Sequence, residues 1–365
     1  MIKMNDFRAE PEALLAAQSQ AFERVQRSGW YILGPELIAF EREWAERCAV
    51  AACAGVANGL DAIEIGLKAI GIGAGDEVIT TPMTAFATVL GIIRAGATPV
   101  LADIDPASGL LDPNSVERCI SPRTRGVLLV HLYGQMRRMD EWLDLCQRHG
   151  LELLEDCAQS HLSSWRGRTA GGFGRWGAYS FYPTKNLGAL GDAGALVSVD
   201  TALIDRAKQL RNYGQSERYH HPLLGANSRL DELQAALLRA RLTYLAEFTT
   251  QRRSIAQRYR QGIDNPRLSL LAPPEEAAAH CYHLFVLRTP QRDALVQHLR
   301  AHEIESLSHY PLPIHAQEPL RAAARDPQGL RQAEQHAACC LSIPCHPQLG
   351  ADEVERVIAA LNSFR

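Results

Sequence analysis

The chain has 365 residues, which is enough for a large α/β domain and a smaller one with a substantial buried core. Its net charge of −3 and its 22% of charged residues give no whole-molecule basis for binding nucleic acid or a membrane surface. No apolar run approaches the roughly 20 residues that a bilayer requires, and the N-terminus carries no apolar signal segment, so we expect a cytoplasmic protein.

The chain opens with helical patterns over residues 11–27 and 35–48, joined by a turn that contains glycine and aromatic residues. From about residue 50 to residue 200, short apolar runs alternate with amphipathic stretches. The predicted strands are 77–80, 98–102, 126–130, 151–154, 177–181 and 195–199, and the predicted helices are 60–70, 83–95, 137–149 and 201–212. This alternation predicts a mainly parallel sheet with helices on both faces, in which ligands bind beyond the carboxyl ends of the strands.

The later part of the chain begins with a long helical pattern from about residue 228 to 262, which ends before Pro266. Beyond it we expect a strand near 281–288, a helix at 291–303 and a closing helix at 351–362. The predicted domains are therefore 1–265, with the N-terminal helices and the large α/β domain, and 266–365, a smaller α+β domain.

Nine cysteines are scattered along the chain without a C-x-x-C pair. An odd number of cysteines without metal-binding spacing argues against both a disulfide framework and a zinc site. We therefore expect free thiols and no metal ion, in agreement with a cytoplasmic location.

Lys185 is the first candidate for chemistry. It follows the predicted strand 177–181 through a turn at Pro183 and is followed by a loop of small residues. A lysine at a strand end, in a partly desolvated cleft, can have its pKa lowered enough to act as a nucleophile or a base. Most lysines are exposed, so for Lys185 taken alone a place in a polar surface turn is the more common explanation.

Asp156 is the second candidate, because it stands at the end of an apolar strand and Gln159 follows shortly after it. A carboxylate at the carboxyl end of a strand is well placed to face a ligand in the crevice. A cofactor with a pyridinium nitrogen needs such an acceptor, since the charged ring can then take up electrons from the reacting carbon. A helix N-cap is the alternative role for Asp156.

A third candidate is the turn Asn58-Gly59-Leu60, where the chain passes from a strand into a helix. Free backbone N–H groups at a helix start attract an anion through their geometry and through the helix dipole. The signal is weak by itself, since every βα unit has such a turn. The turn is neither a P-loop nor a G-x-G-x-x-G fingerprint, so nucleotide hydrolysis and dinucleotide binding have no motif support.

Together these segments resemble the sugar aminotransferases of the DegT–DnrJ–StrS family, which have the aspartate-aminotransferase fold, fold type I of the pyridoxal-phosphate enzymes. The similarity extends from residues 31–36 nearly to the C-terminus. It includes residues 75–80, 103–106, 131–135, 155–160, 180–186, 211–214, 227–234 and 309–313. So many ordered matches make the resemblance specific.

The resemblance implies roles for the matching residues. Lys185 would hold pyridoxal 5'-phosphate as a Schiff base and then move a proton between the two reacting carbons. Asp156 would pair with the ring nitrogen, and Gln159 would lie against the ring and its hydroxyl side.

The phosphate and the substrate would be bound by further residues that the same resemblance assigns. The phosphate would be held by Ser180 and the amides of Gly59 and Leu60, with Asn227 reaching it from the neighbouring subunit of a homodimer. The substrate side of the pocket would be lined by His309, Tyr310 and Tyr219.

This sequence departs from the family pattern at two positions. Leu60 stands where the family usually has threonine or another small polar residue, so its phosphate contact would be mainly through the backbone. Ala85 stands where the family has a ring-stacking aromatic residue, and Phe86 comes one residue later. Either Phe86 covers the ring through a local shift, or Ala85 contributes only a methyl group. An ordinary core position on a helix is an equal alternative for Phe86.

The implied activity is a ping-pong transamination, in which L-glutamate loads the cofactor and a nucleotide-linked keto-sugar accepts the amine. Residues 188–194 and 29–34 look most like members that act on dTDP-linked 3-keto-6-deoxyhexoses. Members that act at C4, or on UDP-linked acetamido sugars, share most of the motifs.

Two other functions remain as alternatives. A dehydratase of the same fold has histidine in place of the lysine, whereas this chain has Lys185. A non-catalytic regulatory protein that binds pyridoxal phosphate would have no need for the complete set of Lys185, Asp156 and Gln159.

Overall fold

The computed structural model describes residues 1–365, and an eight-stranded sheet runs through its larger part in the order β1-β9-β8-β5-β4-β2-β3-β12. The strands are β1 Ala52–Val56, β2 Glu77–Thr80, β3 Thr98–Leu101, β4 Thr124–Val130, β5 Glu152–Asp156, β8 Gly177–Ser180, β9 Gly194–Ser198 and β12 Ala324–Arg325. Strand β9 is antiparallel to both of its neighbours, and the other pairs are parallel. The predicted mainly parallel sheet is confirmed.

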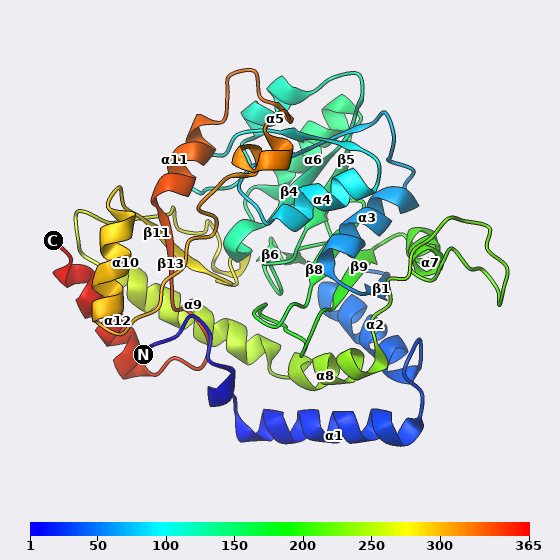
Figure 1. Ribbon diagram of the computed structural model, residues 1–365, viewed down its shortest axis with the longest axis horizontal. Helices are drawn as coiled ribbons and strands as arrows, with labels where there is room; N and C mark the ends of the chain where they lie inside the picture. The colour runs from blue at the N-terminus through cyan, green and yellow to red at the C-terminus, as the bar shows by residue number, and fades with distance from the viewer.

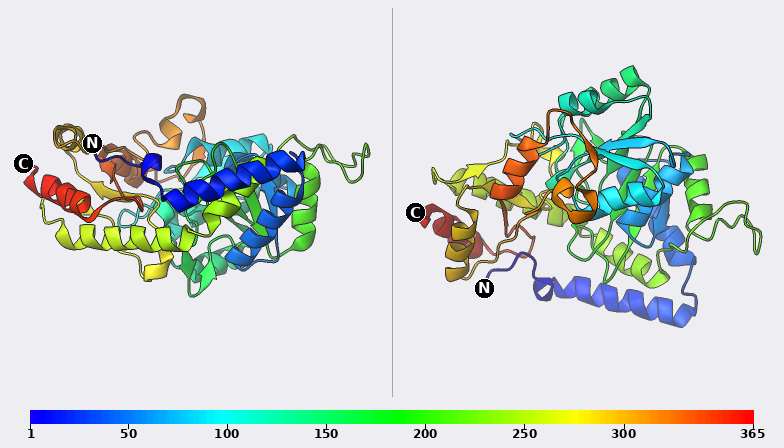
Figure 2. Two further views of the ribbon diagram at one scale, coloured as in Figure 1. Left: turned by 90° about the horizontal axis from the view of Figure 1, so that it is seen from below. Right: turned by 45° about the horizontal axis from the view of Figure 1, so that its top comes forward.

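Helices cover both faces of this sheet (Figure 1), because its strands are apolar on both sides. Along β4, Val127 and Leu129 belong to one core cluster and Leu128 to another, as the alternation of a strand requires. The first cluster packs against α2 Pro35–Cys48, α5 Pro113–Cys119, α6 Met139–His149 and α8 Glu232–Leu242. The second packs against α3 Gly59–Ala69, α7 Thr201–Leu210 and the end of α4 Phe86–Arg94. Helix α1 Glu12–Ser28 lies along α8 on the outside (Figure 2).

The C-terminal part has its own core around a three-stranded antiparallel sheet, at the left of Figure 1. Its strands are β10 Ser269–Leu270, β11 Phe285–Arg288 and β13 Cys340–Ile343, and its helices are α9 Leu245–Gly262, α10 Arg292–Ala301, α11 Arg331–Cys339 and α12 Ala351–Ser363. Strands β6 Ser164–Trp165 and β7 Arg168–Thr169 form a separate small hairpin. Short 3-10 helices are η1 Phe7–Ala9, η2 Leu132–Gly134, η3 Ala277–Ala279, η4 Ile314–Ala316 and η5 Glu318–Leu320. No helix is both long and apolar enough to cross a membrane.

The prediction of one long helix over 228–262 is wrong. The chain forms α8 and α9, with a break at Thr243 and Tyr244. The break directs α8 against α1 and α2, and α9 against α12. Neither glycine nor proline marks it, so the sequence pattern alone does not reveal it. The strand predicted near 281–288 is also shorter, starting at Phe285, because Tyr282 has a left-handed backbone with φ 48°, which interrupts regular strand geometry.

Three segments cross the predicted domain boundary after residue 265, although the division itself stays a prediction. Helix α9, which ends at Gly262, packs in the core of the C-terminal part. Ile2 forms a bridge with Ile304 of the C-terminal part. In the other direction, β12 pairs with Val100 and Leu101 of β3 at the edge of the large sheet. A shared core cluster that includes Leu132 of η2 lies between the two parts. This shared cluster includes the last residues of β3 and β4, Leu101 and Val130, and so lies at the carboxyl ends of these strands, next to the candidate site.

Candidate active site

Asp156 is the last residue of β5, and only 5% of its surface is exposed. The hydroxyl of Thr88, on α4, donates to Asp156 Oδ2 at 2.7 Å, and the Ala158 amide donates to Oδ1 at 3.1 Å. Thr84 Oγ1 lies 2.7 Å from Thr88 Oγ1 and extends this network. No helix begins after Asp156, so the N-cap alternative is wrong. The carboxylate is instead held in one orientation at the carboxyl edge of the sheet.

Lys185 lies in the turn after β8, which is closed by its own amide donating to the Tyr182 carbonyl at 2.8 Å. The side chain is half-buried. Burial lowers the pKa of Lys185 to about 8, although the charge of Asp156 acts in the opposite direction. About a tenth of the Lys185 amine is therefore uncharged at pH 7, far more than for an ordinary lysine.

The surroundings of Lys185 contain three histidines that stay neutral. Burial first, and the charge of Lys185 second, lower the pKa of His161 to about 3 and that of His309 to about 4. The same two causes lower the pKa of His283. Lys185 is thus the side chain in this group that can both take up and release a proton near neutral pH.

Gln159 has an amide group whose orientation is fixed by the backbone. The Tyr133 amide donates to Gln159 Oε1 at 2.6 Å, and because an N–H can only donate, the accepting atom must be the oxygen. The Gln159 NH₂ group then faces the Tyr310 hydroxyl at 3.3 Å. Burial, with the Asp156 charge as the second cause, raises the pKa of Tyr310 to about 12. Tyr310 therefore lies within electrostatic reach of Asp156 and beside Gln159.

Gly59 and Leu60 begin α3, and Asn58 caps the helix by accepting from the Asp61 amide at 2.8 Å. The amides of Gly59 and Leu60 have no acceptor within the chain. A Cβ placed on Gly59 would lie 2.7 Å from Ser180 Cβ, so the helix start and the end of β8 touch, and only glycine leaves room. The two free amides and the Ser180 hydroxyl form a cradle suited to a phosphate dianion.

Ala85 and Phe86 lie at the start of α4, where Ala85 is the N-cap residue. The neighbouring Thr84 and Thr88 belong to the network around Asp156. Phe86 is 37% exposed and lies outside the core clusters, so its core alternative is wrong. Which of Ala85 and Phe86 would cover a cofactor ring stays a prediction.

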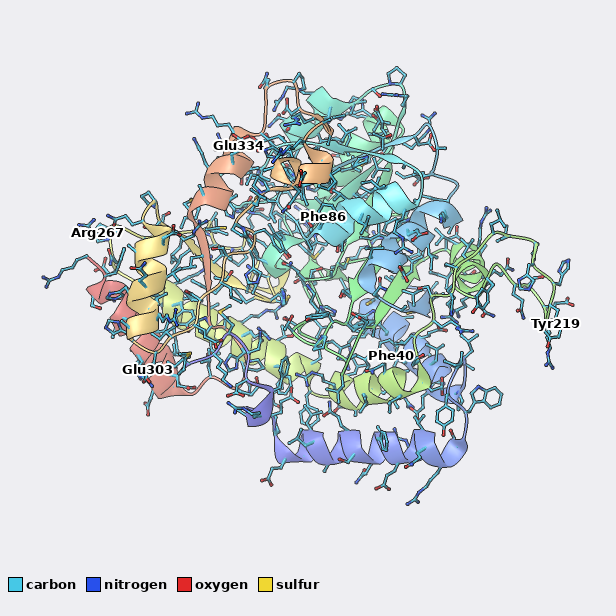
Figure 3. All side chains as sticks on the ribbon, in the orientation of Figure 1. Phe40, Phe86, Tyr219, Arg267, Glu303 and Glu334 are labelled. Carbon is cyan, nitrogen blue, oxygen red and sulfur yellow. The ribbon has the colours of Figure 1, made fainter.

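Asn227 and Tyr219 are not brought to the other site residues of the same chain. Both lie in the segment between α7 and α8, which projects from the body of the molecule (Figures 1 and 2). Tyr219 is 80% exposed near the end of this projection (Figure 3), and its hydroxyl accepts a hydrogen bond from Arg218. Asn227 is exposed and pairs through its backbone with Asn212.

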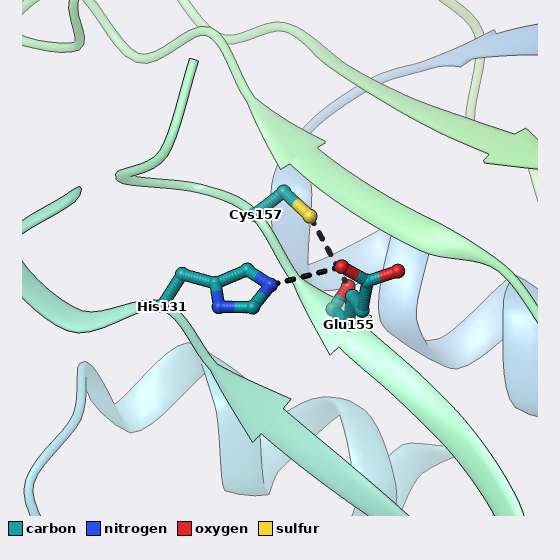
Figure 4. A group of neighbouring side chains, drawn as sticks. All are labelled: His131, Glu155 and Cys157. Carbon is teal, nitrogen blue, oxygen red and sulfur yellow. Dashed lines mark hydrogen bonds and ion pairs between the residues drawn. The ribbon is translucent and has the colours of Figure 1, made fainter. Parts of the chain in front are cut away.

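A group of potential metal ligands, His131, Glu155 and Cys157, lies beside Asp156 (Figure 4). His131 Nε2 is 2.9 Å from Glu155 Oε2. The same carboxylate accepts the amides of Gly171, Phe173 and Gly174 at 2.7–2.9 Å. Burial raises the pKa of the Cys157 thiol well above its usual value, so it stays protonated. Since the lone pairs of Glu155 are occupied, the group ties residues 171–174 to the sheet and explains the burial of Glu155 without a metal ion.

A lysine of lowered pKa, a buried carboxylate at a strand end and an amide cradle at a helix start define a pyridoxal-phosphate enzyme of fold type I. Residues 13–362 match the DegT/DnrJ/EryC1/StrS aminotransferase family, and the chain belongs to this family. The protein is a pyridoxal-phosphate-dependent sugar aminotransferase.

Individual relatives are similar over almost their whole length. The dTDP-3-amino-3,4,6-trideoxy-alpha-D-glucose transaminase of Streptomyces venezuelae is 43% identical over 98% of this chain and 95% of its own. The erythromycin biosynthesis sensory transduction protein EryC1 of Saccharopolyspora erythraea is 43% identical over 94% of each chain. The crystal structure of S. venezuelae DesV, 43% identical, superposes with a TM-score of 0.94 and covers 98% of this chain and 97% of its own.

Two residues with close contacts to the site were missed by the sequence interpretation. Thr88 holds Asp156, and Tyr133 holds Gln159. Tyr133 stands inside the matching segment 131–135, so its position there was the available signal, whereas Thr88 lies outside the matching segments, close to Ala85 and Phe86, where the sequence departs from the family pattern. Their partners, however, are 68 and 26 residues away in the chain, and only the fold brings them together.

The lowered pKa of Lys185 predicts the pH dependence of cofactor capture. Because only the uncharged amine attacks a carbonyl, the rate at which cofactor-free protein binds pyridoxal phosphate covalently should rise about tenfold from pH 7 to pH 9 and then level off. Stopped-flow absorbance measures this rate, with Lys185→Arg as the control that gives no covalent capture. A rate that still rises steeply above pH 9 would indicate an ordinary lysine pKa.

Proposed function

We propose that this enzyme transfers the amino group of L-glutamate to C3 of a dTDP-linked 3-keto-6-deoxyhexose. The observation that carries the proposal is the combination of Lys185, with its lowered pKa, and the buried carboxylate of Asp156 beside a free amide cradle. The choice of sugar is supported by the relative from S. venezuelae, whose name specifies a dTDP-3-amino sugar.

The residues of the site fit pyridoxal phosphate in charge and in hydrogen-bonding capacity. The amides of Gly59 and Leu60 and the hydroxyl of Ser180 would hold its phosphate, because both amides lack an acceptor in the chain and Gly59, having no side chain, lets the helix start lie against Ser180. Asp156 would face the ring nitrogen, with Gln159 against the ring. When bound, the cofactor supplies the carbonyl that accepts the amine and a ring that draws electrons from the reacting carbon.

The side chains of this chain then perform the proton transfers and the positioning. Lys185 takes up and releases the proton at the reacting carbons, because its amine titrates near the working pH while the histidines around it stay neutral. The Asp156 carboxylate, oriented by the Thr88 hydroxyl, would accept from the ring nitrogen. His309 and Tyr310 border the substrate side.

We also propose that the active unit is a homodimer with shared sites, located in the cytoplasm. The segment between α7 and α8 carries exposed apolar side chains that a second copy would cover, among them Tyr219 and Leu224, the latter 98% exposed. Asn227 stands at the base of this segment, where it would reach the phosphate of the other subunit. Free cysteines, eight of them buried, agree with a reducing compartment.

A panel of nucleotide-linked keto-sugars tests the substrate. The panel contains dTDP-linked 3-keto and 4-keto hexoses and UDP-linked keto-sugars, each incubated with L-glutamate, and NMR locates the new amine. We expect amination at C3 of the dTDP-linked sugar, with a kcat/KM at least about tenfold above that of the 4-keto compound. Reaction of the 4-keto compounds alone would contradict the C3 assignment. Loading by L-glutamate without transfer to any sugar of the panel would contradict the proposed substrate.

A further inference from the structure

Tyr133 connects two groups of site residues that come from different parts of the chain. It lies in η2, directly after β4, is fully buried, and has a left-handed backbone with φ 63°. Its amide donates to Gln159 Oε1 at 2.6 Å, and its hydroxyl donates to the His309 carbonyl at 2.5 Å. One residue therefore holds Gln159 through its main chain and the substrate-side segment through its side chain.

The substrate-side segment, residues 307–311, is otherwise tied to the C-terminal part. The backbones of Leu307 and Ser342 exchange two hydrogen bonds, at 3.1 and 2.7 Å. His309 Nδ1 lies 2.9 Å from Ser342 Oγ. From the large-sheet part, Tyr133 supplies the one hydrogen bond to the backbone of this segment. The 3.3 Å hydrogen bond from Gln159 to the Tyr310 hydroxyl is a second, longer link between this segment and the large-sheet part.

The Tyr133 hydroxyl is itself held by a third element. His336, on α11, has Nε2 2.9 Å from the tyrosine oxygen. Since the tyrosine uses its single proton for the His309 carbonyl, His336 must donate through Nε2–H. Burial lowers the pKa of His336 to about 4, which keeps this neutral donor form over the physiological range. A Cβ on Gly109 would lie 3.2 Å from His336 Cε1, so glycine gives the imidazole its room.

We propose that Tyr133 is a positioning residue for the keto-sugar: by tying His309 to the same residue that orients Gln159, it fixes the substrate side of the pocket relative to the cofactor side. This inference rests on the proposed function, which places the sugar at His309 and Tyr310. The hydroxyl of Tyr133, with its support from His336, would then affect substrate binding more strongly than the chemistry at Lys185.

The test compares Tyr133→Phe with Tyr179→Phe in the holoenzyme. Tyr179 is a matched control, because it is also fully buried, donates to a backbone carbonyl, that of Ala170, at 2.5 Å, and accepts from the thiol of Cys48 at 3.7 Å. With a dTDP-linked 3-keto-6-deoxyhexose as substrate, Tyr133→Phe should raise KM about tenfold and change kcat less than about threefold. Tyr179→Phe should change neither constant by more than about twofold. A fall in kcat at unchanged KM, or equal effects of both variants, would overturn the proposal.

A second measurement does not depend on the sugar. Amide hydrogen exchange of residues 305–313 should be faster in Tyr133→Phe than in the wild type, and unchanged in Tyr179→Phe. If the wild type aminates no keto-sugar, the proposed function fails, while faster exchange would still support the tie at His309 and equal exchange would overturn it.

If Tyr133→Phe does not fold, His336→Leu removes only the supporting donor and should raise KM about threefold. An unchanged KM in that variant would count against the proposal.

Discussion

Lys185→Ala should lower the rate of amino-group transfer by about 10⁴-fold, because the variant loses both the attacking amine and the group that moves the proton. Two buried histidines feel the charge of Lys185, but with pKa values of about 3 for His161 and about 4 for His309 they are poor proton carriers near neutral pH and cannot replace the lysine. The half-reaction with L-glutamate, followed through the cofactor absorbance, measures the loss.

The control for this variant is Lys68→Ala, which removes a lysine on α3 that pairs with Glu64 at 2.6 Å. It should retain activity within about twofold. The phosphate cradle of Gly59, Leu60 and Ser180 remains in Lys185→Ala, so we expect the cofactor to bind without a covalent link. Transfer by Lys185→Ala at more than about 1% of the wild-type rate would refute the role given to Lys185.

Asp156→Asn should lower kcat by about 10²- to 10³-fold, because a neutral amide cannot stabilise a charged ring nitrogen as a carboxylate does. The variant has a second signature. Asp156 raises the pKa of Lys185, so its removal should lower that pKa further below about 8. The pH profile of cofactor capture should therefore shift to lower pH, and an unshifted profile would contradict the proximity of the two charges.

Asp112→Asn is the matched control, since Asp112 caps α5 through a similar bond from the Asn114 amide at 3.1 Å but has no contact with the site. It should leave both kcat and the pH profile unchanged. Thr88→Val, which removes the hydroxyl that donates to Asp156, should give an intermediate loss of about tenfold. A full loss in Asp112→Asn would indicate general destabilisation instead of chemistry.

The sheet was predictable because its signals are local. Each strand from β2 to β9 in the main sheet appeared as an apolar run, and the run 77–80 coincides with β2 Glu77–Thr80. Strand β12 was not predictable, because its two residues, Ala324 and Arg325, carry no run and become a strand only by pairing with Val100 and Leu101. The break between α8 and α9 likewise depends on packing partners and not on a breaker residue.

The site was predictable for residues whose chemistry is visible at a strand end. Asp156 ends β5 and Lys185 follows β8, and the fold brings them within electrostatic reach of each other. Tyr133 lies in the matching segment 131–135, but nothing local in the sequence indicates that its amide and its hydroxyl hold two other segments. Tyr219 is exposed on a projecting segment of the single chain. Its predicted contact with substrate would need the second subunit of the proposed homodimer.

The pairing of β12 with β3 has a consequence for synthesis. While the chain emerges from the ribosome, β3 presents an open edge until Ala324 and Arg325 arrive, and open strand edges favour association between chains. A fragment that stops at residue 265 would keep that edge permanently and would also leave Ile2 without Ile304. Efforts to obtain the cofactor-binding part by truncation should therefore yield aggregates, whereas coexpression with residues 266–365 as a separate chain offers the edge its natural partner.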